Sequence, residues 1–280
     1  MIKNSLKTTI VLALLLIPIL ASAEMSQEEI AKATQNPLTA MYSIPIQNNT
    51  YFNAGPDDQT KNIANFQPVI PIDWSDDWTL VTRTIMPLTY LPSGMTNNPA
   101  LGIDDGTQFG LGDTTFTAFF TPKNAEEGDL LWGLGPVFYL PTATNDSLGT
   151  KKWGAGPAGV ALKMSGKWVY GALLMNIWSF AGSGQDDGIQ RVNLMTFQPF
   201  VNYNLDDGWF VSSVPIITAN WEEDSDHRWT VPLGMGVGRA MKFGKIPGTA
   251  QIHAYYNVVT PDDYGETWQI RIQVQFLFPR

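Results

Sequence analysis

Histidine and carboxylate side chains are the groups with which this sequence could perform acid–base chemistry. The chain has 280 residues and no cysteine, and its two histidines are His227 and His253. Without cysteine, thiolate zinc sites, cysteine nucleophiles and disulfides are excluded. Neither histidine has a serine two residues further on, so no local Ser–His spacing supports nucleophilic catalysis. We therefore expect no catalytic residue, no metal site and no cofactor.

Two local motifs carry weaker signals. Asp224, Asp226 and His227 fall in one loop and could form an acid–base site like those of outer-membrane proteases, although a solvated acidic loop has the same composition. Residues 154–159 match the G-x-G-x-x-G pattern of dinucleotide sites. That pattern must open a helix, whereas here Pro157 interrupts it and a Ser-Gly turn follows soon after. We interpret these glycines as strand residues.

The overall charge bears on possible partners. The sequence has 17 basic and 26 acidic residues, for a formal net charge of −9. Lysine and arginine form no cluster along the chain. A protein that binds the phosphate backbone of a nucleic acid needs such a cluster, so we expect no nucleic-acid partner.

The N-terminus has the pattern of a cleaved export signal. Lys3 and Lys7 precede an apolar run from Ile10 to Leu20, and Ala21-Ser22-Ala23 follows. The run is shorter than the roughly 20 apolar residues of a membrane-spanning helix. We expect residues 1–23 to be removed after export.

Beyond a short helical candidate at Ser26–Thr34 with a capping box, the hydrophobic period becomes two. The clearest strand is Trp268–Phe278, where apolar residues alternate with Gln and Arg. Prolines within such stretches remove hydrogen-bond donors, and we expect some of them to mark bulges. Including this one, we predict twelve strands, which begin near Met41, Asn62, Trp78, Phe109, Leu130, Trp153, Lys167, Arg191, Gly208, Arg228, Gly248 and Trp268.

The connections between these strands alternate between short and long. Tight turns such as Ser165-Gly166 are followed by longer polar loops such as residues 182–190. In an antiparallel sheet this places short turns at one end and long loops at the other, as in outer-membrane barrels. The prediction is an all-β chain in which residues 24–39 form an N-terminal periplasmic or plug segment and residues 40–280 form one antiparallel transmembrane barrel.

Tryptophans at predicted strand ends favour the barrel over a soluble β-sandwich, which would more often place tryptophan in mid-strand. A barrel carries aromatic residues at both membrane interfaces. The expected interface aromatics are Trp74, Trp78, Trp168, Trp209 and Trp268.

The parity of each strand indicates which charged residues face the lumen. Assuming that the apolar face of every strand points to lipid, the inward residues are Asp73, Arg83, Asp113, Lys163, His253 and Arg271. They are the candidate lining of a solute path, although charges that merely pair and fill the lumen would show the same pattern. Folding the last hairpin about Asp262 places His253 directly opposite Arg271, as lumen neighbours.

Several segments are similar to the phenol-degradation-pathway outer-membrane transporter family. They are residues 135–144, 148–157, 176–182, 198–203 and 231–234 and the terminal Phe276-Leu277-Phe278-Pro279-Arg280. The resemblance implies an outer-membrane barrel that passes small compounds, often hydrophobic or aromatic. In barrels generally, a terminal aromatic residue is recognised during insertion; here Phe278 is followed by two further residues.

These observations lead to one functional expectation. We predict a passive channel for small molecules in the outer membrane of a Gram-negative-type bacterium, with outer-membrane lipid and the barrel-insertion machinery as its other partners. A barrel enzyme acting on lipid or peptide and a soluble secreted β-sandwich binding domain remain as alternatives.

Overall fold

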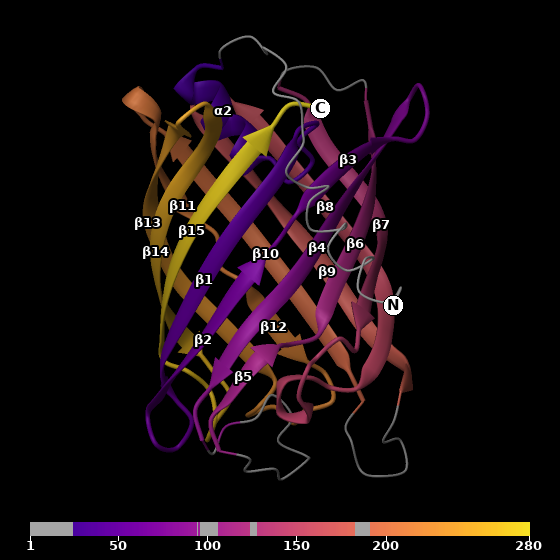
Figure 1. Ribbon diagram of the computed structural model, residues 1–280, viewed down its shortest axis with the longest axis vertical. Helices are drawn as coiled ribbons and strands as arrows, with labels where there is room; N and C mark the ends of the chain where they lie inside the picture. Colours follow the sequence, from indigo (N-terminus) through magenta and orange to yellow (C-terminus); the bar gives the residue numbers. More distant parts are fainter. Residues whose placement is uncertain (1–24, 94, 96–105, 124–127, 183–190) are drawn as a thin grey trace, which may run out of the picture.

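The computed structural model describes residues 25–93, 95, 106–123, 128–182 and 191–280. The expected export signal, residues 1–23, lies outside this set. The described chain forms a closed antiparallel barrel of twelve strands, with one short helix at one end (Figure 1). Among the described residues, no helix has the length and apolarity required to cross a lipid bilayer.

The elements are as follows: α2 Gln27–Gln35, β1 Tyr42–Ala54, β2 Gln59–Phe66, β3 Val69–Asp73, β4 Trp78–Leu91, β5 Gln108–Leu111, β6 Thr114–Pro122, β7 Leu130–Leu140, η3 Asp146–Leu148, β8 Lys152–Ser165, β9 Trp168–Gly182, β10 Asn193–Asn204, η4 Asp206–Gly208, β11 Trp209–Ser213, β12 Ile217–Asn220, β13 Trp229–Phe243, β14 Ile246–Val259 and β15 Trp268–Phe278. When β2 with β3, β5 with β6, and β11 with β12 are each counted as one strand, every strand pairs with its neighbours in the sequence, and β1 pairs with β15 to close the barrel.

Three of the twelve strands are interrupted, which accounts for fifteen labels. The segments β2 and β3 both lie between β1 and β4, β5 and β6 both pair with β4, and β11 and β12 both lie between β10 and β13. The partner strand carries a proline opposite each break: Pro45, Pro87 and Pro199. Because proline has no N–H, the ladder cannot continue on that side. At Pro232 the register shifts, as expected of a bulge.

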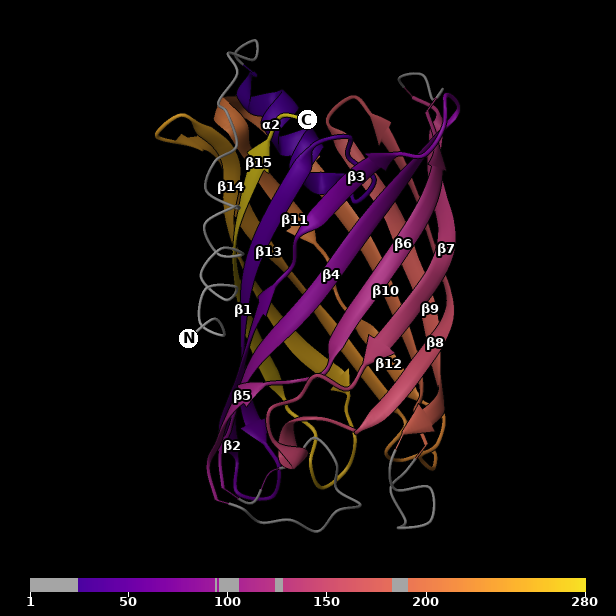
Figure 2. The same cartoon turned by 45° about the vertical axis from the view of Figure 1, so that its right-hand side comes forward.

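The two ends of the barrel differ as the sequence predicts. Turns at residues 74–77, 166–167, 205–208 and 244–245 lie at what we call the short-turn end, whereas the segments 55–58, 141–151, 221–228 and 260–267 lie at the long-loop end (Figures 1 and 2). The helix α2 and the C-terminus lie at the short-turn end (Figure 1).

The register of the last hairpin is the predicted one. Tyr256 pairs with Trp268, and His253 pairs with Arg271. A slip of one residue would move every apolar side chain to the other face, so the alternating pattern specifies this pairing strongly.

The inner surface of the barrel has two different sides. The inner faces of β4 and β6–β9 form what we call the apolar wall: Val81, Phe119, Val137, Ala158, Val160, Leu162, Val169, Leu173 and Ile177. The inner faces of β1, β14 and β15 form the polar wall: Ser43, Gln47, Asn49, Thr249, His253, Asn257, Gln269, Arg271 and Gln275. The lumen is therefore amphipathic.

The N-terminal segment enters the barrel at the short-turn end. Ser26 and Glu29 form the predicted capping box that begins α2. Ile30 and Ala31 pack with Phe210, Ala240 and Leu277 in one buried cluster. Further along the chain, Leu38 belongs to the buried cluster of the apolar wall. The segment thus contacts two different parts of the inner surface.

Candidate solute path

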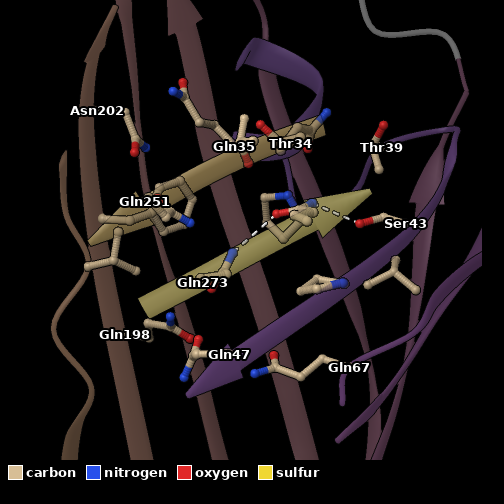
Figure 3. Close-up of a pocket in the computed structure, with 18 of the residues that line it drawn as sticks. Thr34, Gln35, Thr39, Ser43, Gln47, Gln67, Gln198, Asn202, Gln251 and Gln273 are labelled. Atoms are coloured by element: carbon tan, nitrogen blue, oxygen red, sulfur yellow. Dashed lines mark hydrogen bonds between the residues drawn. The ribbon is translucent and has the colours of Figure 1, made fainter. Parts of the chain in front are cut away.

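A cavity of about 140 Å³ lies between the N-terminal segment and the barrel wall. Its surface is dominated by amide side chains, which come from several strands and point into the space (Figure 3). They are Gln35, Asn36, Gln47, Gln67, Gln198, Asn202, Gln251, Gln273 and Gln275. Each amide presents both a donor and an acceptor, so this surface can replace the hydration shell of a polar solute.

Two arginines contribute the charge of this cavity. Arg83 of β4 donates a hydrogen bond to Oε1 of Gln67. Arg271 of β15 donates to Oδ1 of Asn49 at 3.0 Å and to the carbonyl of Val214 at 2.8 Å. Among the described residues that line the cavity there is no carboxylate. Both guanidinium charges are therefore held by neutral groups, which leaves the cavity electropositive.

His253 lies beside Arg271 in the polar wall and contacts a serine on a strand two places away. Its Nε2 is 2.7 Å from Oγ of Ser212 on β11. Gly236 lies between them in the sheet, and the imidazole occupies the space that a side chain at Gly236 would fill. The sequence alone does not indicate this pair, because the two residues are distant along the chain. The register of β11, β13 and β14 would have been needed to find it.

A second, larger cavity of about 530 Å³ opens at the long-loop end. Asp113, which lies between β5 and β6, lines it. Its carboxylate accepts hydrogen bonds from the backbone N–H groups of Ala143, at 3.1 Å, and Thr150, at 2.7 Å. Asp113 is therefore inward-facing as expected, with its charge already engaged by the loop.

Lys152 of β8 is a buried cation that is not among the lumen charges predicted from the sequence. Its side chain is 2% exposed, and its Nζ has no hydrogen-bond partner in the structure as described. A buried ammonium without a partner is costly. Lys152 lines neither of the two cavities described above, so we do not place it on the path. The signal was hidden because Lys152 precedes a glycine-rich stretch without clear alternation.

Two of the predicted lumen charges do not line either cavity: Asp73 lies at the rim of the barrel and Lys163 on its outer face. Asp73 shares the inward face of β3 with Val69 but sits at the short-turn rim, where its carboxylate pairs with Lys123 at 2.6 Å and with Arg280. The expectation that Lys163 faces the lumen is wrong. Lys163 pairs across the sheet with Leu130 and Tyr170, which are exposed on the outer face.

The tryptophans form two girdles. Four of the predicted interface residues, Trp74, Trp78, Trp168 and Trp209, are exposed at the short-turn end, and Trp268 is exposed at the long-loop end. Other strand ends add to both girdles: Trp132 at the short-turn end, and Trp153, Trp178, Trp221 and Trp229 at the long-loop end. This distribution is the one expected of a membrane-spanning barrel.

The N-terminal segment is tied to the wall by a reciprocal amide pair. Nε2 of Gln35 donates to Oδ1 of Asn204 at 2.9 Å, and Nδ2 of Asn204 donates to Oε1 of Gln35 at 3.1 Å. Thr34, Gln35, Asn36, Pro37 and Thr39 all line the smaller cavity. The segment thus forms part of the boundary of the candidate path.

The acidic loop near His227 joins two neighbouring loops. Nδ1 of His227 is 2.8 Å from Oδ1 of Asp224, and its ring stacks on Tyr264 with centroids 5.4 Å apart. The hydrogen bond to Asp224 raises the pKa of His227 and lowers that of Asp224. Burial, with nearby carboxylates, raises the pKa of Tyr264 to about 12. These contacts connect the loop 221–228 to the loop 260–267.

Comparisons with known proteins agree with the barrel architecture. No protein-family model matches the sequence, and no curated protein matches it either. Among solved structures, the COG4313 outer membrane channel from Pseudomonas putida F1 is similar, with 16% identity and a TM-score of 0.64 over 86% of this chain and 97% of that one. A NanC porin is 8% identical with a TM-score of 0.52 over 85% of this chain and 100% of that one. These similarities show the fold.

Proposed function

We propose that the protein is a passive outer-membrane channel for small molecules that combine a polar or anionic group with an apolar, often aromatic, body. The observation that carries this proposal is the cavity in which Arg83 and Arg271 lie without a carboxylate. An anion that enters it meets two guanidinium charges and many amide N–H donors. Leu173 and Phe200 line the same cavity and offer apolar contact to the rest of the solute.

The proposed path runs between the two ends of the barrel. The cavity at the long-loop end receives the solute, and the arginine-lined cavity follows. Conduction requires sites that attract a solute but release it again, and single hydrogen bonds from flexible glutamines satisfy this requirement. The tryptophan girdles would hold the barrel at the two membrane interfaces.

Residues 25–41 act as a plug in this proposal. They line the arginine cavity and are held by the Gln35–Asn204 pair and by the Ile30 contacts. Deleting residues 25–36 should raise single-channel conductance without changing the barrel, because this segment contributes no strand.

Charge reversal at one arginine tests the function directly. In planar bilayers under a salt gradient, the wild-type reversal potential should indicate a preference for anions. Arg83→Glu should shift it towards cations, because lumen charges act on the permeating ion. An unchanged reversal potential would contradict the assignment of Arg83 to the path. Outer-membrane fractionation with heat-shifted mobility checks the membrane location.

A barrel enzyme is the second candidate, and Ser212–His253 is the contact that favours it. However, Nδ1 of His253 has no hydrogen-bond partner in the described structure, so no third group orients the imidazole as in a Ser–His–acid triad. A screen with lipid and peptide substrates, with Ser212→Ala as the matched variant, separates the two: hydrolysis that disappears in the variant would replace the channel proposal.

A further inference from the structure

Two glycine–proline dipeptides face one another in the apolar wall. Gly135-Pro136 lies on β7 and Gly156-Pro157 on β8, and Pro136 pairs directly with Pro157. Proline has no N–H to donate to a neighbouring strand. Two adjacent strands therefore lack a donor at the same height of the barrel.

The strand pairing is interrupted on both sides of these prolines. Between β6 and β7, the pair Thr117–Val137 is followed only by Phe120–Leu134, and the positions of Gly135 and Pro136 are unpaired in this described part of the wall. Between β8 and β9, the described pairing likewise omits Gly156 and Pro157. The β7–β8 ladder itself is continuous. The hairpin β7–β8 thus has a continuous ladder of its own, whereas its pairing to β6 and to β9 is interrupted at the Gly-Pro positions.

The glycines in these dipeptides allow the neighbouring backbones to approach closely. A Cβ atom at Gly135 would overlap the carbonyl oxygen of Ala118, and one at Gly156 would overlap that of Asn176. At this height the backbones of neighbouring strands are therefore closely packed, although the regular pairing between them is interrupted. Within a membrane, backbone groups without a partner are costly, so an interrupted ladder is a place where two strands are easier to separate.

An apolar groove of about 650 Å³ lies on the outer face of the same strands. Trp132, Leu134 and Leu174 border it, and the small residues Gly159, Ala161 and Ala172 form its floor. On the inner face, the same stretch of β8 contributes Ala158, Val160 and Leu162 to the apolar wall. Apolar surface is thus present on the inner and the outer face of the barrel wall where the pairing is interrupted.

We propose that this place is a lateral exit, through which an apolar permeant passes from the lumen into the membrane, and that the outer groove is the binding site it occupies on leaving. The inference rests on the proposed channel function and extends it to solutes without a charge. Opening here breaks fewer hydrogen bonds than opening an uninterrupted ladder, because the two prolines have no N–H to donate. The occupant is a small apolar molecule, since the groove and the wall behind it offer almost no polar contact.

The cysteine-free sequence permits a direct test. Ala158 and Met175 are opposite one another on β8 and β9 at the edge of the interruption. In Ala158→Cys/Met175→Cys, a disulfide would hold the two strands together. Intact cells are given the apolar dye N-phenylnaphthylamine, which fluoresces once it reaches lipid, and conductance is recorded in bilayers with the purified protein. We expect oxidation to reduce dye uptake to the rate of cells without the protein, reduction to restore it, and conductance to remain unchanged.

Matched variants keep the test decisive. Ala250→Cys/Val274→Cys joins two opposed residues of β14 and β15 on the other side of the barrel and should leave dye uptake unchanged. Pro136→Ala/Pro157→Ala restores both donors without a disulfide and should reduce uptake, whereas Pro45→Ala in the polar wall should not. Heat-shifted mobility confirms that each variant is folded.

The outcomes separate the two proposals. A wild-type protein that conducts ions but takes up no dye, or dye uptake that is insensitive to both the disulfide and the proline variants, overturns the lateral exit and leaves the channel intact. Such insensitivity would also mean that lipid chains alone occupy the groove. A protein that does not conduct at all contradicts the proposed function itself.

Discussion

The polar and apolar walls of the barrel place their hydrophobic residues differently. In β14 and β15, Ile252 and Ile272 are exposed on the outer face, whereas His253 and Arg271 are buried on the inner face. In β8 the apolar Val160 and Leu162 face inward. The polar wall is built from strands with one apolar face, and the apolar wall from strands with two.

This difference separates two roles within one lumen. Arg271 and the amides of the polar wall offer hydrogen bonds to a solute, and the residues named above for the apolar wall offer contact without them. Arg83 of β4 adds a single charge on the apolar side of the cavity. The interrupted ladders around Pro136 and Pro157 fall within the apolar wall. Substitutions should therefore act differently on the two sides.

The largest effect is expected where the backbones of the apolar wall approach most closely. Gly156→Ala should lower the free energy of unfolding by about 3 kcal/mol, because its methyl group overlaps the carbonyl oxygen of Asn176. The pairs Ala155–Trp178 and Ala158–Met175, which flank this position along the strands, limit how far the two backbones can separate. Urea unfolding in micelles measures the loss. Gly159→Ala is the control: its methyl group would meet the flexible end of Leu134 at 2.9 Å, which can move. Equal losses for the two variants would contradict the close-approach argument.

A smaller effect on stability should distinguish the two arginines. Arg271→Gln removes hydrogen bonds to Asn49 and Val214 and should cost about 2 kcal/mol, because buried partners are left unsatisfied. Arg83→Gln loses one hydrogen bond, to the side chain of Gln67, and should cost about half as much. Both should weaken anion selectivity, as reversal potentials would show. If only Arg271→Gln altered selectivity, Arg83 and the β4 side of the cavity would not belong to the solute path.

The contact between the loops 221–228 and 260–267, at the long-loop end, should depend on pH. The pKa of His227 is raised above its ordinary 6.5, chiefly by the hydrogen bond to Asp224, so the contribution of the ion pair is complete below pH 6.5 and is lost as pH rises through the higher folded value. The pKa of Asp224 is lowered, so its contribution is lost as pH falls through that lower value. Proteolysis of the loop 221–228 should accelerate as pH rises above 6.5 and through the raised pKa of His227, and His227→Asn should remove this dependence. An unchanged profile in the variant would assign the pH effect to another group.

The sequence was sufficient to predict the architecture because most of it depends on local patterns. The capping box predicted α2, alternation predicted the His253–Arg271 pairing, and turn lengths predicted the two ends. Contacts between distant strands were not predictable in this way. Ser212–His253 depends on Gly236 between them, and the Gln35–Asn204 pair depends on where the N-terminal segment enters the barrel.

Lys163 shows where the reasoning from alternation fails. In β8, Val160, Leu162 and Met164 are apolar and were assumed to face lipid, which would turn Lys163 inward. These residues face the lumen, because this strand belongs to the apolar wall. A period of two identifies two faces but does not say which is inside when the lumen itself is apolar.

The smallest effect is therefore expected for Lys163→Gln. This variant tests which face of β8 points into the lumen. Lys163 lies opposite Leu130 and Tyr170 on the outer face, two residues before the end of β8 at the short-turn end. From there its ammonium can extend along its alkyl stem to the membrane interface. Because it does not face the path, its removal should leave the reversal potential unchanged, whereas Arg83→Gln in the same assay should shift it. A shift in Lys163→Gln as large as that of Arg83→Gln would mean that β8 turns its other face to the lumen, and the assignment of an apolar wall would fail with it.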